Sequence, residues 1–268
     1  MPELPEVETI VRRLRPRLTG RRVSNLEILW PRTLCNHGPA PDRIRNQRVD
    51  SVERRGKFIC LGLQDLRLTI HLRMSGRVVF DCRGENPNHI RARIHFENSE
   101  CLTLVDARKF ARIQLWPTEQ PFLPRMGPEP LRRETVKEVL DGVISHRPIK
   151  AVLLDQHILA GIGNIYADES LFLARIHPQT PARNLTPRQR SRLAAAIPRI
   201  LEAAIQGLGT TLNDYRDPNH QPGVFQHQLC AYQRTGKPCL VCGTPITRIV
   251  VAQRGTHFCP RCQRERAK

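Results

Sequence analysis

Cys239-Leu240-Val241-Cys242 and, sixteen residues later, Cys259-Pro260-Arg261-Cys262 form the stretch that most strongly predicts a local fold in this chain. Two Cys-x2-Cys pairs at this separation are typical of a tetrahedral four-thiolate zinc site. Four thiolates leave no open position for a catalytic water, so we expect one structural Zn²⁺. Between the pairs, residues 249–252 and 256–258 resemble two strands of a hairpin with Gln253-Arg254-Gly255 at its tip. The metal would therefore aim Arg254, although an exposed turn arginine on a structural ribbon is the simpler interpretation.

The chain begins Met1-Pro2-Glu3-Leu4-Pro5-Glu6. Removal of Met1 would leave the secondary amine of Pro2 at the terminus, beside the carboxylate of Glu3. Such an amine forms an iminium directly with a sugar C1′ or an aldehyde, which is a route of covalent catalysis. The alternative is structural, because proline suits the first turn of a helix and carboxylates there complement the helix dipole. Apolar residues at helical spacing continue to Leu18, and Gly20 follows as a stop signal, so we expect a helix here.

Short β-like segments separated by turn residues follow this helix and favour a sandwich or barrel. They span residues 23–29, 49–52, 58–63, 68–72, 77–80, 90–96, 101–105 and 111–116. A Pro-rich stretch over residues 121–130 is typical of a linker. Helical patterns then span residues 136–143, 149–159, 165–174 and 187–206.

These patterns predict an α+β protein of three domains. Residues 1–130 form the N-terminal helix and β-sandwich, residues 131–225 a helical domain, and residues 226–268 the four-cysteine finger. Residues 214–223 are expected to form a long loop.

The composition indicates a polyanionic partner. Lys and Arg number 43 against 25 Asp and Glu, a formal net charge of +18, which points to nucleic acid. Ribosomal and membrane-surface proteins share such a charge, so it needs a specific site to interpret it. No run approaches the roughly 18 apolar residues of a membrane span, and the terminus lacks the apolar core of a signal peptide. Nine cysteines are an odd number, and five of them are scattered, which suits a reducing, cytoplasmic compartment: Cys35, Cys60, Cys82, Cys101 and Cys230.

Gly161-Ile162-Gly163-Asn164 lies between two helical stretches and opens the second of them. Amides at a helix N-terminus bind phosphate well. A dinucleotide-binding fold is disfavoured, because a helix and not a strand precedes the glycines and Tyr166 breaks the Gly-x-Gly-x-x-Gly pattern. A helix-turn-helix phosphate clamp fits better, and a plain helix-helix turn remains the alternative.

Together these motifs resemble those of bacterial formamidopyrimidine-DNA glycosylases, in the same order and over the whole chain. The motifs are Met1-Pro-Glu-Leu-Pro-Glu, Arg54-Arg-Gly-Lys57, His71-Leu-Arg-Met74-Ser-Gly, Asp106-Ala-Arg108-Lys-Phe110, Gly161-Ile-Gly-Asn164-Ile-Tyr-Ala-Asp-Glu169 and the finger with Gln253-Arg254. Leu4-Pro5 resembles this branch and not the related endonuclease VIII branch, which typically carries Gly at the fourth position. The resemblance implies a helix-two-turn-helix domain between the sandwich and a zinc-ribbon finger, in a monomer that acts on duplex DNA.

The activity that the resemblance implies is bifunctional repair: excision of oxidised purines, chiefly 8-oxoguanine and formamidopyrimidines, followed by nicking of the abasic strand. Pro2 would attack C1′ of the flipped nucleotide, and Glu3 would protonate the ring oxygen of the sugar. Lys57 would hold phosphate and donate the proton for β-elimination. Arg254 would grip the phosphates beside the lesion and serve δ-elimination. The expected location is the bacterial cytoplasm, at the nucleoid through DNA binding.

Six further residues are implied to contact DNA. Met74, Arg108 and Phe110 match the family's wedge residues, which occupy the space that a flipped base leaves. Without the resemblance, Met74 and Phe110 would be interpreted as ordinary core residues. The family's phosphate contacts match His89, Lys150 and Asn164, although a lone histidine or lysine is more often a solvated surface residue.

Two departures from the family pattern affect the expected specificity. Pro218-Asn219-His220 replaces a Ser-Asp-Gly-like stretch in a loop that covers the flipped base in relatives, and Tyr232-Gln233-Arg234 stands where Tyr-Gly-Arg is common. The alternatives are an endonuclease VIII-like glycosylase for oxidised pyrimidines and a non-catalytic zinc-ribbon DNA-binding protein. The Pro2-Glu3 terminus argues against the second.

Overall fold

The structure, a computed structural model, describes residues 1–35, 38–81, 83–97, 99–120, 123, 125–213 and 215–265. Its chain divides into two compact units, and each is described by itself. The first unit comprises residues 1–124 and 207–226, and the second comprises residues 125–206 and 227–268. Short 3₁₀ helices connect the longer elements: η1 (Pro31–Thr33), η2 (Pro41–Ile44), η3 (Pro87–His89), η4 (Ala182–Asn184) and η5 (Phe225–Gln228).

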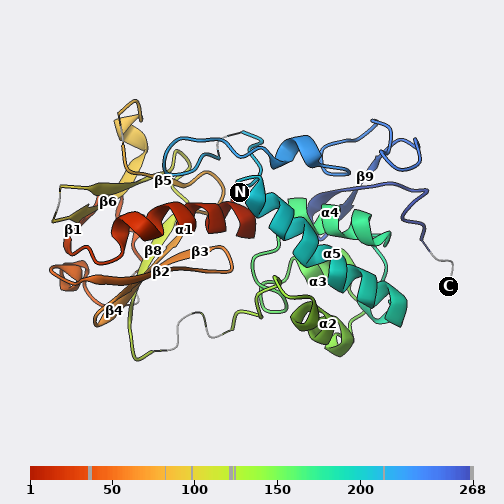
Figure 1. Ribbon diagram of the computed structural model, residues 1–268, viewed down its shortest axis with the longest axis horizontal. Helices are drawn as coiled ribbons and strands as arrows, with labels where there is room; N and C mark the ends of the chain where they lie inside the picture. Colours follow the sequence, from red (N-terminus) through yellow and green to blue (C-terminus); the bar gives the residue numbers. More distant parts are fainter. Residues whose placement is uncertain are drawn as a thin grey trace. The chain divides into compact units, whose positions relative to one another are not determined.

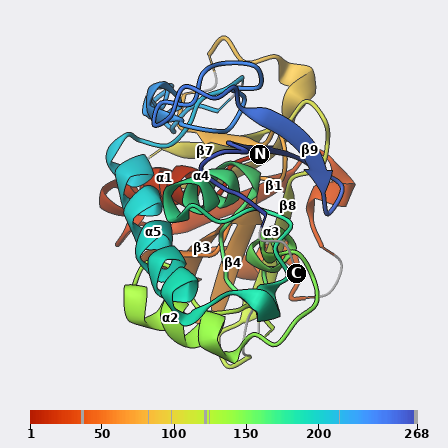
Figure 2. The same ribbon diagram turned by 90° about the vertical axis from the view of Figure 1, so that its right-hand side faces the viewer.

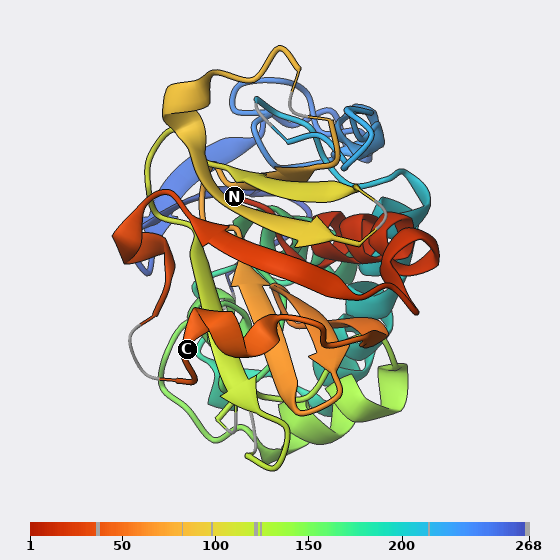
Figure 3. The ribbon, with the colours of Figure 1, turned by 90° about the vertical axis from the view of Figure 1, so that its left-hand side faces the viewer.

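The first unit is a two-layer antiparallel sandwich with one long helix (Figures 1 and 3). One sheet has the order β1 (Val23–Ile28), β6 (Ile90–Phe96), β7 (Cys101–Val105) and β5 (Arg77–Val79). The other has the order β2 (Val49–Arg55), β3 (Phe58–Leu63), β4 (Leu66–His71) and β8 (Arg112–Pro117). Figure 3 shows the two sheets as separate layers, with the yellow β6 and β7 in one and the orange β2 to β4 in the other.

Helix α1 (Leu4–Leu18) shares the core of this unit with the two sheets. Its apolar stripe of Val7, Ile10, Val11, Leu14 and Leu18 is at most 1% exposed. The stripe arises because positions three and four apart lie on one face of a helix. Each such buried side chain contributes about 1.5–3 kcal/mol to stability. This packing fixes the helix that has Glu3 at its N-cap and Glu6 in its first turn.

The second unit combines helices with a small β-hairpin. Its elements are α2 (Arg133–Gly142), α3 (Ile149–Leu153), α4 (Asn164–Ala174), α5 (Pro187–Gln206), β9 (Thr247–Val251) and β10 (Arg254–Phe258). The twenty-residue α5 packs against α2 and α4 (Figure 2). Nearly every side chain of α4 is buried, so α4 is the central helix of this unit.

The predicted α+β class is confirmed, and the eight predicted strands are all present. Two local predictions were wrong. The helix expected over residues 149–159 ends at Leu153. There the side chain of Gln156 replaces helical hydrogen bonds: its Nε2 donates to the carbonyls of Leu154 and Ile162, and its Oε1 accepts from the backbone N of Gly161. A side chain that satisfies the backbone in this way competes with continued helix.

The hairpin tip was also misplaced by one residue. Ala252 and Gln253 have φ of 49° and 58°, which makes them the two central residues of the turn. Arg254 lies beyond this turn, as the first residue of β10, and pairs with Val251.

Some predictions fall partly outside the described residues, namely Pro121, Phe122 and Pro124 of the Pro-rich stretch, Asp214 of the loop, and Cys82. The eight cysteines within the described ranges form no disulfide. Among the helices that the structure describes, none has the length and apolar character needed to cross a membrane.

Candidate functional site

Glu6 holds the N-terminal segment in place. Pro2 is buried, and Glu3 is only 3% exposed at the N-cap of α1. One oxygen of Glu6 accepts from the backbone N of Glu3 at 2.8 Å, and the other accepts from the backbone N of Thr210 at 2.7 Å. Gly209 has a φ of 85°, and a Cβ there would lie 2.9 Å from the Glu6 side chain. Only glycine therefore fits at 209, and the terminus is tied to a segment far away in sequence.

Lys57 lies in the tight turn between β2 and β3 and is only 7% exposed. Arg54 supports this turn by donating to the carbonyl of Gly56 at 3.1 Å and to Glu8 of α1 at 2.9 Å. Burial raises the pKa of Glu8, but hydrogen bonds from Arg12 and Arg54 outweigh it and lower that pKa. The lysine turn is thereby joined to the helix that begins at the Pro2-Glu3 terminus.

His71 is the neutral group beside this lysine. Burial lowers its pKa to about 3, with further lowering by the charges of Arg73 and Lys57. Its Nδ1 accepts from the backbone N of Arg73 at 2.9 Å, and its ring packs edge-to-face on Phe58. The ring is therefore uncharged at neutral pH, so Lys57 and Arg73 supply the positive charge here.

Asp106 shapes the turn that carries Arg108 and Phe110. It follows β7 directly and is fully buried. Its Oδ1 accepts from Ser75 Oγ at 2.6 Å and from the backbone N of Arg108 at 3.1 Å. Its Oδ2 accepts from the backbone N of Phe110 at 2.6 Å and of Ala111 at 2.7 Å. One carboxylate thus satisfies four donors and fixes the path of the turn.

The predicted wedge residues and His89 gather around this carboxylate. Met74 adjoins Ser75 in sequence, and the backbone N of Asp106 donates to the carbonyl of His89 at 2.8 Å. Met74 is 46% exposed and Phe110 is 43% exposed, so the interpretation of both as core residues was wrong. The guanidinium of Arg108 lies 5.0 Å from the centroid of the Phe110 ring. Two large apolar side chains and an arginine are therefore presented to solvent on one framework.

Asp106→Asn is expected to destabilise the first unit by about 2–4 kcal/mol, because an amide has one acceptor oxygen for four donors. Urea unfolding followed by circular dichroism measures the change. Asp42→Asn, at an exposed position, is the matched control and should leave the midpoint unchanged. If Asp106→Asn is as stable as the control, Asp106 does not fix the turn that carries Arg108 and Phe110.

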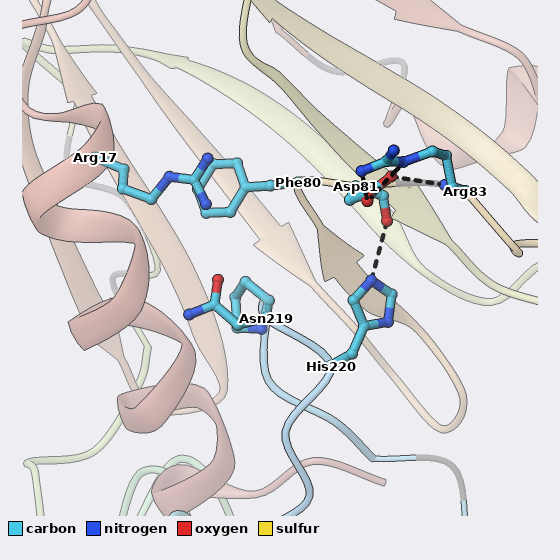
Figure 4. A pocket seen from close by; sticks show the side chains of 7 residues that line it. Arg17, Phe80, Asp81, Arg83, Asn219 and His220 are labelled. Atoms are coloured by element: carbon cyan, nitrogen blue, oxygen red, sulfur yellow. Dashed lines mark hydrogen bonds and ion pairs between the residues drawn. The ribbon is translucent and has the colours of Figure 1, made fainter.

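The loop over residues 215–223 is bound to α1 and to the segment that follows β5. Asp217 is almost fully buried, and its carboxylate accepts from Arg13 Nε at 3.1 Å and from the backbone N of Asn219 and Gln221. His220 has a φ of 63°, a region that favours glycine and costs other residues about 1 kcal/mol. Its Nε2 lies 3.0 Å from the carbonyl oxygen of Asp81 (Figure 4).

A pocket lies between this loop and the sandwich within the first unit. It is lined by Arg17, Phe80, Asp81, Arg83, Pro218, Asn219 and His220 (Figure 4). Arg17 stacks on Phe80, with its guanidinium carbon 3.5 Å from the ring centroid. Pro218, Asn219 and His220, the three residues that depart from the family pattern, therefore all line this pocket, and His220 also contacts Asp81.

The four cysteines of the finger fit one zinc ion. Their Sγ atoms all lie within 4.8 Å of one another, with 4.0 Å between Cys239 and Cys262 and 3.4 Å between Cys242 and Cys259. A tetrahedron with Zn–S bonds of about 2.3 Å has edges of about 3.8 Å. The donor set and its spacing match a closed structural site.

Lys150 and Asn164 contact the hairpin of β9 and β10, the finger hairpin, within the second unit. Asn164 Nδ2 donates to the carbonyl of Gly255 at 2.9 Å, beside the exposed Arg254. Lys150 is not at the surface as a phosphate contact requires: it is 0% exposed, and its Nζ lies 2.6 Å from Asp168. The reason is that Asp168, one turn into the central helix α4, neutralises the ammonium there.

Sequence reasoning missed Glu6, Asp106 and Asp168 as organising residues. Asp106 carried a usable signal, because an Asp directly after a strand and before an exposed turn commonly accepts from the backbone amides that follow. The bond of Glu6 to Thr210 and the bonds of Asp168 to β10 join segments remote in sequence, and no local pattern shows such partners.

Three family models match this chain. They are the formamidopyrimidine-DNA glycosylase N-terminal domain over residues 1–113, the formamidopyrimidine-DNA glycosylase H2TH domain over residues 126–215, and the zinc finger found in FPG and IleRS over residues 236–264. A formamidopyrimidine-DNA glycosylase of Symbiobacterium thermophilum is 45% identical over 98% of this chain and 89% of its own length.

Solved structures show the same likeness. The Fpg protein of Thermus thermophilus is 41% identical, with a TM-score of 0.85 over 99% of this chain and 100% of that one. A Lactococcus lactis Fpg mutant in complex with DNA containing Fapy-dG is 35% identical, with a TM-score of 0.87 over 98% of this chain and 100% of that one. Other complexes of the L. lactis protein contain DNA with an abasic site or an oxidised pyrimidine.

Proposed function

The chain belongs to the formamidopyrimidine-DNA glycosylase family, and from this premise we infer that it is a base-excision-repair DNA glycosylase acting on oxidised lesions and abasic sites in duplex DNA. We propose 8-oxoguanine and formamidopyrimidines as its main substrates, and strand nicking as its second activity. The observation that carries the proposal is the buried Pro2-Glu3 terminus, which Glu6 fixes at the start of α1. The four cysteines of the finger bind one structural zinc ion.

The proposed reaction begins when the free amine of Pro2 attacks C1′ of the damaged nucleotide. The bond from C1′ to the base breaks, and the base leaves with the bonding electron pair and takes up a proton, which balances the proton that the Pro2 nitrogen loses. Glu3 donates a proton to the ring oxygen, the sugar opens, and C1′ becomes an iminium of the Pro2 nitrogen. Loss of a C2′ proton then expels the 3′ phosphate, and a second elimination expels the 5′ phosphate. Lys57 and Arg254 are the proposed residues for these two steps.

DNA binding in this proposal uses the groups gathered around Asp106. Extrusion of a base costs a few kcal/mol, and side chains that fill the vacated space offset part of that cost. Met74 and Phe110 supply exposed apolar volume, and Arg108 supplies donors to the base left behind. We propose His89 and Asn164 as phosphate contacts, since phosphate contacts set the register of a protein on DNA.

Arg108→Ala is expected to reduce the preference for cytosine over adenine opposite 8-oxoguanine by about one to two orders of magnitude. A guanidinium can donate to the acceptors of an orphaned cytosine, and a good polar pairing is worth about 1–3 kcal/mol. Met74→Ala should instead slow excision opposite both bases, because it fills space without reading a base edge. Single-turnover excision rates measure both effects, and an unchanged rate ratio for Arg108→Ala would exclude it from base recognition.

The substrate class is tested by single-turnover excision on three duplexes, which contain 8-oxoguanine opposite cytosine, thymine glycol opposite adenine, or no lesion. We expect fast excision of 8-oxoguanine and none from the undamaged duplex. Faster excision of thymine glycol would place the chain with oxidised-pyrimidine enzymes instead, and the altered Pro218-Asn219-His220 stretch makes this comparison informative.

We also propose that the enzyme is a monomer and works in the bacterial cytoplasm, at the nucleoid. The net charge of +18 supports the nucleoid location, because it favours association with DNA of any sequence. Gel filtration with light scattering checks the first part, and fluorescence microscopy of a tagged chain checks the second.

A further inference from the structure

We propose that Lys150 and Asp168 form a buried charge pair that docks the finger hairpin on helices α3 and α4 and so sets the position of Arg254. Lys150 is then a positioning residue that never touches DNA. The inference rests on the proposed role of Arg254 in gripping DNA.

Lys150 has the contacts of an anchor. It lies in α3 and is 0% exposed. Its Nζ donates to Asp168 Oδ1 at 2.6 Å, to Thr256 Oγ1 at 2.8 Å and to the carbonyl of Gly255 at 3.2 Å. An ammonium has three protons to donate, and these three acceptors use them. Two of the acceptors belong to β10, which begins at Arg254.

Asp168 binds the same strand from α4. Its Oδ2 accepts from the backbone N of His257 at 2.8 Å and lies 3.1 Å from Nδ1 of the His257 ring. The pair therefore contacts three consecutive residues, 255 to 257, from two helices. Asn164 adds a second donor to the carbonyl of Gly255 at 2.9 Å. The residue that directly follows Arg254 is thus held by two independent side chains.

The zinc site alone leaves this end of the hairpin unsupported. Cys259 follows the far end of β10, five residues beyond Arg254, and a strand rises about 3.3 Å per residue. The arginine is therefore about 16 Å of strand away from the nearest cysteine in sequence. The metal fixes the cysteine end of β10, and the Lys150–Asp168 pair fixes the arginine end.

The pair can be removed by a double substitution that leaves no unpaired buried charge. Removing one partner leaves an uncompensated buried charge, whereas replacing both by neutral groups of similar shape is tolerated. We therefore choose Lys150→Met together with Asp168→Asn, which keeps an acceptor for the backbone N of His257 but removes the bonds to Gly255 and Thr256. Lys137→Met with Asp141→Asn, an exposed pair on α2, is the matched control.

The test measures three properties of the full-length, zinc-loaded protein. These are zinc content, hydrogen exchange of the hairpin peptide, and affinity for a duplex with a tetrahydrofuran abasic analogue. Each is measured with Arg254 present and in an Arg254→Ala background. We expect the buried-pair variant to keep one zinc per chain, to exchange faster at residues 254–257, and to bind the duplex about tenfold more weakly. In the Arg254→Ala background it should cause no further loss of affinity.

Two outcomes would overturn the proposal. The first is a hydrogen-exchange rate at residues 254–257 equal to that of the control variant. It would mean that Lys150 and Asp168 do not dock the hairpin, and this conclusion does not depend on DNA binding. The second is a further loss of DNA affinity in the Arg254→Ala background. If the slope of log binding constant against log salt concentration also fell by about one, the value for one phosphate contact, Lys150 would be a direct DNA contact. Failure of the proposed function is separate, because the unmodified protein would then show no preference for the abasic duplex over an undamaged one.

Discussion

Protein that retains Met1 is expected to lose at least about 10⁴-fold in both base excision and strand nicking, because both steps of the proposed mechanism use the free amine of Pro2. With Met1 attached, the Pro2 nitrogen belongs to a peptide bond and its lone pair is delocalised into the carbonyl. It can then neither attack C1′ nor form an iminium. DNA binding should remain, since the proposed phosphate contacts and wedge residues do not depend on this nitrogen.

The measurement compares protein made with and without inhibition of methionine aminopeptidase in the producing cells. Intact-mass spectrometry gives the fraction of chains that keep Met1, and excision activity should follow the remaining fraction in proportion. Gel-shift affinity for the abasic analogue duplex controls for folding. Full activity in a preparation in which every chain keeps Met1 would contradict the covalent mechanism.

Glu3→Gln is expected to slow base excision by about 10²–10⁴-fold, the usual contribution of a positioned general acid. The amide has nearly the shape of the acid but no proton to give to the ring oxygen of the sugar. The backbone N of Glu3, which Glu6 binds at 2.8 Å, is unaffected by the change. Affinity for DNA and the unfolding midpoint should therefore stay close to those of the unmodified protein.

Glu6→Gln is the matched control for this variant. Glu6 uses both oxygens to bind the backbone of Glu3 and Thr210, so the amide loses one acceptor and stability should fall by about 1–3 kcal/mol. Single-turnover excision and thermal unfolding of both variants separate chemistry from structure. Equal losses of excision and DNA binding in Glu3→Gln would show that Glu3 is structural.

The sequence predicted most elements because their signals are local. The predictions rested on the apolar stripe of α1, the turn residues that bound the short β-like segments, and the spacing of Cys239, Cys242, Cys259 and Cys262, all of which depend on neighbours in the chain. Each is therefore visible in a short window. The end of the helix expected over residues 149–159 also depends on local contacts, but apolar periodicity does not show them. It does not reveal that the side chain of Gln156 turns back onto backbone groups within six residues.

The same distinction applies to the site. The exposure of Met74 and Phe110, the proposed wedge residues, was expected only from the resemblance, since their residue types favoured burial. The burial of Lys150 could not be read from its neighbours in sequence, because its partners are Asp168 and Thr256, 18 and 106 residues away. Charge balance in a protein interior is decided by tertiary contacts of this kind.

Borohydride trapping tests the covalent mechanism, because it captures the proposed iminium that joins the enzyme to the sugar. Enzyme is mixed with labelled duplexes that contain 8-oxoguanine or thymine glycol, reduced, and digested for peptide mass spectrometry. We expect a covalent enzyme–DNA product with the 8-oxoguanine duplex, with the sugar attached to the nitrogen of Pro2. Efficient excision without any trapped product, or sugar attached to a lysine such as Lys57, would contradict it.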